Sequence, residues 1–135
     1  MAGPFKFELV SPERLLLSEE ALQVDLPGTD GDFGILEGHS PFISTLRPGV
    51  AVITLPGGSI QKFFVRGGLA EVSAAGLTVL AEKAIALSDL KADEIAQEVK
   101  NAEEDVADAA TEMARQAAEM RLAQMKDLAN ALKAA

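Results

Sequence analysis

The sequence predicts an all-β domain followed by a helical hairpin. Apolar and polar side chains alternate with a period of two through much of the first 87 residues, which is typical of half-buried strands. From residue 89 onward there is no glycine or proline and alanine dominates, which favours helix. This change in composition predicts two domains, at residues 1–87 and 88–135.

Composition excludes several classes of function. The 135 residues are 48% hydrophobic and 24% charged, as in a globular protein, and the formal net charge is −9. That charge opposes binding to nucleic acid or to anionic lipid. The chain has no cysteine, and no apolar run reaches the roughly 18 residues of a membrane-spanning helix. We expect a soluble chain whose work at a membrane would go through a protein partner.

The β-rich part contains short strand-like runs separated by turn residues, with no helix between them. This pattern favours a sandwich or a barrel over βαβ units. Pro56, Gly57 and Gly58 stand between two such runs and predict a hairpin. The expected strands are Phe5–Leu9, Arg14–Ser18, Leu22–Leu26, Val50–Leu55, Ile60–Val65, Leu69–Ser73 and Leu77–Ala81.

The segment Pro27–Gly49 concentrates residues with special backbone properties. It contains five of the 11 glycines, three of the six prolines and the only histidine. It also holds Asp30, Asp32 and Glu37 but no basic residue before Arg47. Two interpretations stay open. The segment is either an ordinary long connection inside a β-domain or a shaped, acidic recognition loop, since long loops without structure of their own are often functional.

The chain lacks the residue patterns of known catalytic sites. It has no cysteine nucleophile and no G-x-S-x-G elbow, and its single histidine, His39, lacks the partners of a zinc site. Gly28, Gly31 and Gly34 are not followed by the Lys-Ser/Thr of a phosphate-binding loop. We expect a non-enzyme without metal or cofactor, in which His39 is a hydrogen-bonded loop residue rather than an acid–base catalyst.

The helical part carries two apolar stripes in different phase, which predicts two helices that break within Asp105–Thr111. Asp108 or Thr111 would cap the second helix, and Ser88 or Asp89 the first. One continuous helix of about 68 Å is the alternative. The stripes are Ile95, Val99, Ala102, Val106, Ala109 and Met113, then Ala118, Leu122, Met125, Ala129 and Leu132.

Charge divides the helical part again. Residues 89–112 hold nine acidic and two basic side chains, whereas residues 113–135 have a net charge of +2. The helices either pair antiparallel, with about 0–1 kcal/mol from each exposed ion pair, or present two solvated faces. Alanine buries little apolar area, at roughly 25 cal/mol per Å². We therefore expect a hairpin that is held weakly and can detach.

Several motifs give the chain a resemblance to a known family. They are Ser11-Pro-Glu, Pro27-Gly-x-x-Gly31-Asp-Phe-Gly34-Ile-Leu-x-Gly-His39-Ser-Pro41, Leu46-Arg-Pro-Gly49, Gly67-Gly68-Leu-Ala-Glu-Val and Leu77-Thr-Val-Leu-Ala-Glu82. With a helical tail of the expected length, the chain resembles the epsilon subunits of bacterial and chloroplast F-type ATP synthases over essentially its whole length. The mitochondrial counterpart, called delta, is similar, but because no Arg- and Ser-rich transit peptide precedes this chain, we expect the bacterial or chloroplast form.

The resemblance implies a flattened β-sandwich of about ten strands followed by a two-helix hairpin. It implies a non-catalytic rotor subunit that sits on the gamma subunit and on the c-ring loops during proton-driven ATP synthesis. Such a subunit is peripheral, at the cytoplasmic face of the bacterial inner membrane or at the photosynthetic membrane. By position, the loop around Asp32 faces the c-ring, and Ser11, His39 and Ser44 face gamma. The expected partner interface comprises Ser11, Asp30, Asp32, Phe33, Glu37, His39 and Ser44.

The resemblance also implies a regulatory tail. Its last helix extends along gamma into the alpha/beta head in some members and impedes ATP hydrolysis. Arg115, Arg121, Lys126 and Lys133 are compatible with docking on acidic segments of the head.

Some members hold the hairpin closed with bound ATP, through an Ile/Leu-Asp-x-x-Arg-Ala motif. Here Lys91 and Glu94 replace the Asp and the Arg of that motif. The exchange removes the phosphate partner and places a carboxylate near it, so we expect weak or absent ATP binding.

Two hypotheses of other classes stay open. A free-standing β-sandwich binding module would use the helices as a dimerising tail and would be a dimer in dilute solution. A rotor subunit would instead be monomeric alone and co-elute with gamma. An enzyme ranks third, because the residues to sustain it are missing.

Overall fold

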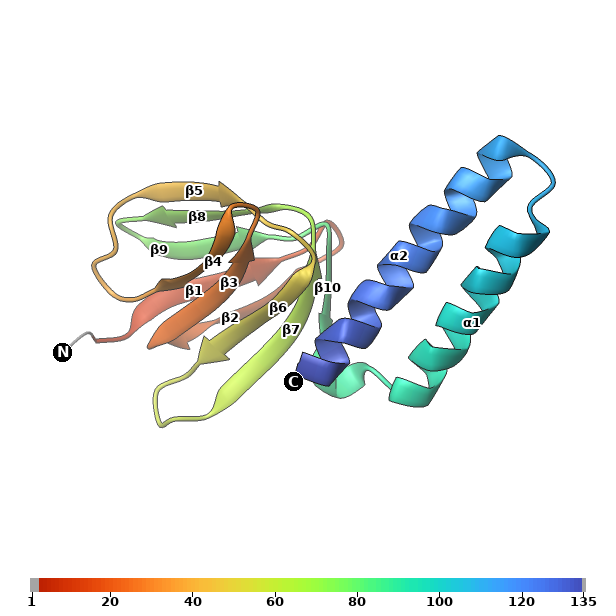
Figure 1. Ribbon diagram of the computed structural model, residues 1–135. Helices are drawn as coiled ribbons and strands as arrows, with labels where there is room; N and C mark the ends of the chain where they lie inside the picture. The colour runs from red at the N-terminus through yellow and green to blue at the C-terminus, as the bar shows by residue number, and fades with distance from the viewer. Residues whose placement is uncertain (1–2, 135) are drawn as a thin grey trace. The chain divides into compact units, whose positions relative to one another are not determined.

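The computed structural model describes residues 3–134, which form two compact units that divide between Ala86 and Leu87. The first unit contains ten strands in two sheets and the second a pair of helices (Figure 1). The predicted fold class, a β-sandwich of about ten strands with a C-terminal helical pair, is therefore confirmed.

The ten strands form two five-stranded sheets, a sandwich rather than a barrel. They are β1 (Phe5–Val10), β2 (Leu15–Ala21), β3 (Gln23–Gly28), β4 (Gly31–Ile35), β5 (Phe42–Thr45), β6 (Gly49–Thr54), β7 (Ile60–Arg66), β8 (Leu69–Ser73), β9 (Gly76–Leu80) and β10 (Lys83–Ala86). One sheet has the order β2-β1-β9-β8-β5 and the other β10-β7-β6-β3-β4. Neighbouring strands are antiparallel, except that β1 and β9 are parallel.

The core of the sandwich lies between the sheets, and the period-two alternation of the sequence produces it. In β1, Phe7 and Leu9 are fully buried, whereas Glu8 lies on the opposite face. In β9, Leu77 and Val79 are buried in the same way. Most members of the buried cluster are aliphatic, as the scarcity of aromatic residues predicts.

The predicted hairpin at Pro56 is confirmed. It joins β6 and β7, and its turn is closed by the N–H of Leu55, which donates to the carbonyl of Ser59 (2.8 Å). Gly57 and Gly58 have φ angles of +96° and +93°. Side chains rarely tolerate this left-handed region, so the turn needs glycine.

The segment Pro27–Gly49 contains two strands that the sequence prediction omits. β4 pairs with β3, and β5 pairs with β8 of the other sheet, so the segment is not a loop without structure of its own. β4 is rich in glycine, which has a low strand propensity; pairing with β3 creates the strand despite its composition. The prediction also omits the short strand β10.

The helical unit consists of η1 (Leu87–Asp89), α1 (Ala92–Asp108) and α2 (Glu112–Ala134). The prediction of two helices is confirmed, with the break inside the predicted interval. α1 and α2 run antiparallel and pack against each other (Figure 1). As predicted, Thr111 caps α2, because its Oγ1 accepts a hydrogen bond from the N–H of Ala114 (3.1 Å).

The predicted start of the first helix is wrong. Ser88 and Asp89 belong to η1, whose tighter i→i+3 turn ends before α1 begins. The residue before α1 is Lys91, whose side chain makes no capping hydrogen bond. Met113 is 82% exposed and does not continue the apolar stripe of α1, because the chain breaks before it.

Candidate functional site

Most of the predicted site residues lie between residues 29 and 47, at one edge of the sandwich, termed here the β4–β5 edge. Gly28 faces Gly31 across the two-residue turn between β3 and β4, which leaves Asp30 exposed at the tip. A Cβ on Gly28 would lie 2.5 Å from the carbonyl oxygen of Gly31 and 2.7 Å from the ring of Phe33. Glycine is therefore needed at residue 28 for space, and the close approach shapes the tip.

Aromatic rings join the two sheets at the β4–β5 edge. Phe33 of β4 meets Phe42 of β5 edge to face, with ring centroids 5.2 Å apart at 77°. The ring of His39 lies 5.7 Å from that of Phe42. His39 Nδ1 also donates to the carbonyl oxygen of Ser40 (2.8 Å), so His39 is a hydrogen-bonded connection residue, as predicted.

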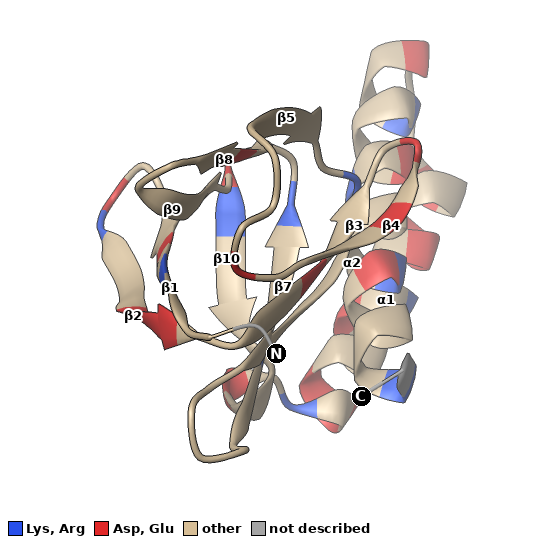
Figure 2. Cartoon of the chain, turned by 90° about the vertical axis from the view of Figure 1, so that its left-hand side faces the viewer, with Lys and Arg blue, Asp and Glu red and all other residues tan. Residues whose placement is uncertain are grey.

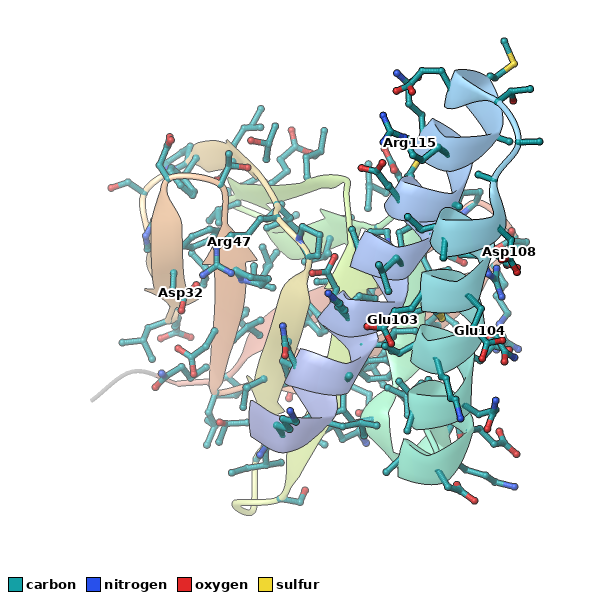
Figure 3. All side chains as sticks on the ribbon, turned by 45° about the vertical axis from the view of Figure 1, so that its right-hand side comes forward. Asp32, Arg47, Glu103, Glu104, Asp108 and Arg115 are labelled. Carbon is teal, nitrogen blue, oxygen red and sulfur yellow. The ribbon has the colours of Figure 1, made fainter. Side chains whose placement is uncertain are left out.

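Two of the three carboxylates of the edge have partners within the chain. Arg47 forms an ion pair with Asp32 and donates a hydrogen bond to its carboxylate. The Arg47 side chain reaches toward β4 (Figure 3). Glu37 accepts a hydrogen bond from the N–H of Gly3 (3.1 Å). Asp30 is exposed at the turn. Arg47 therefore compensates the charge of Asp32, whereas the charges of Asp30 and Glu37 keep the edge acidic.

The edge also exposes apolar side chains that the sequence prediction does not assign to a site. Leu36 is 48% exposed, Phe42 38% and Ile43 64%. Two adjacent apolar residues in a strand lie on opposite faces, so Phe42 followed by Ile43 already indicates that one of them points away from the core. Apolar area beside polar groups is typical of a protein–protein contact.

Ser11 lies apart from this group. It follows β1, is 9% exposed, and its hydroxyl donates to Glu13 (3.3 Å). Ser44, in β5, is half-buried and donates to the carbonyl of Thr45 (3.0 Å). Strand register places Ser11 and Thr45 at the same end of their sheet and His39 toward the other end.

The Ser11 end of this sheet carries a second exposed apolar group. Val10 pairs with Leu15 of β2 and with Leu80 of β9, which are 53% and 46% exposed. A hollow of about 310 Å³ lies there, lined by Val10, Ser11, Pro12, Leu80, Ala81 and Glu82. The sequence could have indicated that Leu80 is exposed. Because Leu77 and Val79 face the core, strand alternation places Leu80 on the opposite, outer face of β9.

The predicted tail cations differ in their surroundings. Arg115 pairs with Glu112 (2.7 Å) and Glu119 (3.6 Å), and Arg121 pairs with Glu98 of α1 (2.8 Å). Acidic residues recur along α1, coloured red in Figure 2. Lys126 and Lys133, by contrast, are exposed and have no ion-pair partner within residues 3–134.

Within the described part of the chain, no three potential metal ligands lie close enough together to hold an ion. In the same residues, neither helix has the length and apolarity required to cross a bilayer.

Comparison with known proteins identifies the family. Residues 4–87 match the β-sandwich domain of the ATP synthase delta/epsilon chain. The chain belongs to the ATP synthase delta/epsilon chain family. An ATP synthase epsilon chain of Parvibaculum lavamentivorans is 49% identical to it over 128 residues, 95% of this chain and 97% of the relative. The resemblance inferred from the sequence motifs is confirmed.

Two solved structures contain a chain with the same fold as this one. A chain of the Euglena gracilis mitochondrial ATP synthase, solved as OSCP/F1/c-ring in rotational state 1, matches with a TM-score of 0.81 and 22% identity, over 96% of this chain and 81% of that one. A chain of the Tetrahymena thermophila mitochondrial ATP synthase central stalk and c-ring matches with a TM-score of 0.65 and 16% identity, over 97% and 98%. At these identities, the likeness shows the shared fold.

Proposed function

We propose that this chain is a non-catalytic central-stalk subunit of an F-type ATP synthase, coupling the gamma subunit to the c-ring during proton-driven ATP synthesis. The observation that supports this most directly is the β4–β5 edge, where Leu36, Phe42 and Ile43 are exposed within the domain that matches the family. Asp30 is exposed on the turn that begins β4. The two structures of the same fold are assemblies that include F1 or a central stalk together with a c-ring. Such assemblies would supply protein partners for the edge.

In this proposal, different surfaces of the sandwich contact the c-ring and the gamma subunit. The turn at Asp30 and Asp32 meets the polar loops of the c-ring. The surfaces that carry Ser11, His39 and Ser44 meet gamma, and the exposed leucines near Ser11 supply apolar area for that contact. These partners hold the chain peripherally at the cytoplasmic face of the bacterial inner membrane or at the photosynthetic membrane.

A non-catalytic role agrees with the surroundings of the single histidine. His39 donates Nδ1 to Ser40 and places its ring beside Phe42, which gives it a local structural role in the edge. In this proposal the chain transmits torque and leaves the chemistry to other subunits.

The helix pair is the regulatory element of the proposal, a two-state device whose last helix can extend into the alpha/beta head. Arg115 and Arg121 are already paired with carboxylates of the helical unit. Lys126 and Lys133 would therefore make the first contacts with acidic segments of the head. Arg121 would become available only when α1 and α2 separate.

The test is capture of gamma and the c-ring from detergent-solubilised membranes by the full chain. Ile43→Asp places a charge in the exposed apolar patch and should reduce capture about tenfold. Asp32→Lys should weaken assembly and coupling while the sandwich stays folded. Ser59→Asp, a change at an exposed turn outside both surfaces, is the control and should capture both partners like the wild type. Full capture by Ile43→Asp would contradict the proposed interface.

The regulatory part has its own test. ATP hydrolysis by the reconstituted complex is compared with the full chain and with a chain lacking residues 89–135. Faster hydrolysis without the tail is expected. Equal rates would remove the regulatory role and leave the coupling role in place.

A further inference from the structure

Asp32 and Arg47 form the one ion pair of the sandwich among residues 3–134; the others lie in the helical unit. Both flank the same β3 residue. Asp32 faces Pro27 across the β3–β4 ladder, and the N–H of Arg47 donates to the carbonyl of Pro27 (2.9 Å). The Arg47 side chain extends past this strand to the Asp32 carboxylate (Figure 3).

The local backbone leaves room for this arrangement. A Cβ on Gly49 would lie 2.8 Å from Cβ of Pro27 and 3.4 Å from Nη1 of Arg47. A side chain at residue 49 would therefore press on both the proline and the guanidinium. Gly49 and the Pro27 carbonyl together fix where Arg47 can lie.

Stability alone does not account for a pair held in this way. The side chains of Arg47 and Asp32 are 44% and 73% exposed. Exposed ion pairs contribute little to folding because water screens them. The larger effect is on surface charge, since Arg47 is the only basic residue in a segment that also holds Asp30 and Glu37.

We propose that Arg47 is a positioning residue for the partner contact. It holds the Asp32 carboxylate against the β3–β4 hairpin and compensates its charge, so that a partner loop meets an ordered, neutral pair instead of a mobile anion. Ordering a side chain before association lowers the entropy lost on binding. The inference rests on the proposed function, because it takes Asp32 as part of the surface that docks on the rotor.

The experiment is a double-mutant cycle on the full chain. A fluorescently labelled chain is titrated onto ATP synthase stripped of its own epsilon chain, at low and high salt. Arg47→Gln and Asp32→Asn should each weaken binding roughly three- to tenfold, and together they should cost clearly less than the product of the two losses. Arg47→Gln should also make binding more salt-dependent than in the wild type, a change that a loss of packing would not produce.

Lys83→Gln removes a charge from β10, at the opposite edge of the same sheet, and is the control that should bind like the wild type. Melting temperatures verify that each variant is folded. If Arg47→Gln fails to fold, Arg47→Lys replaces it. That change should weaken binding in the wild-type background and have no effect in the Asp32→Asn background.

Independent, multiplicative losses, or wild-type binding by Arg47→Gln, would overturn the positioning role while leaving the proposed function intact. Failure of the wild-type chain to bind the stripped complex would instead overturn the proposed function.

Discussion

Arg121 of α2 and Glu98 of α1 form an ion pair between the two helices, with Nη2 and Oε2 2.8 Å apart. The sequence predicts this antiparallel pairing as one of two alternatives, because residues 89–112 are strongly acidic and residues 113–135 mildly basic. The side chains are 54% and 45% exposed, so the pair contributes only about 0.2–1 kcal/mol. It therefore adds only a small part to the contact between the two helices.

Charge reversal at this pair should loosen the hairpin. Arg121→Glu replaces the attraction to Glu98 with a repulsion of similar size, and the opening free energy of the helix pair should fall by roughly 1 kcal/mol. Amide hydrogen exchange in α1 and α2 measures the opening. Lys126→Glu, on the same helix, is the control and should change exchange less. Equal effects of the two variants would show that overall charge, not the pair, holds the helices.

The cap of α2 should be the second determinant of the hairpin. Thr111→Ala removes the oxygen that accepts the N–H of Ala114, which should destabilise the start of α2 by about 1 kcal/mol. Hydrogen exchange should accelerate in the first turn of α2. Thr111→Ser keeps the oxygen and should behave like the wild type. If Thr111→Ser accelerates exchange as much as Thr111→Ala, the methyl group and not the cap is responsible.

The sequence predicts the strands whose burial alternates and omits those imposed by neighbours. β1 and β9 follow directly from alternating apolar residues. β4 does not, because Gly31 and Gly34 favour no strand; its pairing places Ile35 opposite Val24 and Phe33 opposite Leu26. Only this tertiary match makes the segment a strand.

The site shows a similar division. Motif and composition identify the region of residues 27–49, but not the partner of Arg47. The sequence offers three acidic partners for Arg47 in the same segment, namely Asp30, Asp32 and Glu37. Which of them pairs with Arg47 depends on the hydrogen bond that holds its backbone N–H on the carbonyl of Pro27. The same limit applies to the first helix. Ser88 is a good capping residue by its type, but in the structure it lies inside η1 and not at the start of α1.

The lack of space for a side chain at Gly28 predicts that a substitution there destabilises the sandwich. Gly28→Ala would drive its Cβ into the carbonyl of Gly31 and the ring of Phe33, so we expect a loss of about 1–3 kcal/mol in the free energy of unfolding. Gly34→Ala meets only a carboxylate oxygen of Asp25 at 2.8 Å, which can rotate away, and should cost less. Urea denaturation of both variants measures the difference. A smaller loss for Gly28→Ala than for Gly34→Ala would contradict the close approach as the cause.

Nucleotide binding to the helical unit should be weak or absent. Lys91 Nζ lies 3.9 Å from Oε1 of Glu94, so the two residues that replace the ATP motif face each other at the start of α1. A phosphate approaching Lys91 would meet the Glu94 carboxylate, and repulsion between like charges opposes binding. Calorimetric titration of the full chain with ATP should give no saturable heat at micromolar concentrations. Lys91→Asp combined with Glu94→Arg restores the Asp and the Arg of the motif and should raise the affinity, whereas Lys100→Asp, a control on the same helix, should not. Micromolar ATP affinity of the wild-type chain would show that other residues hold the nucleotide.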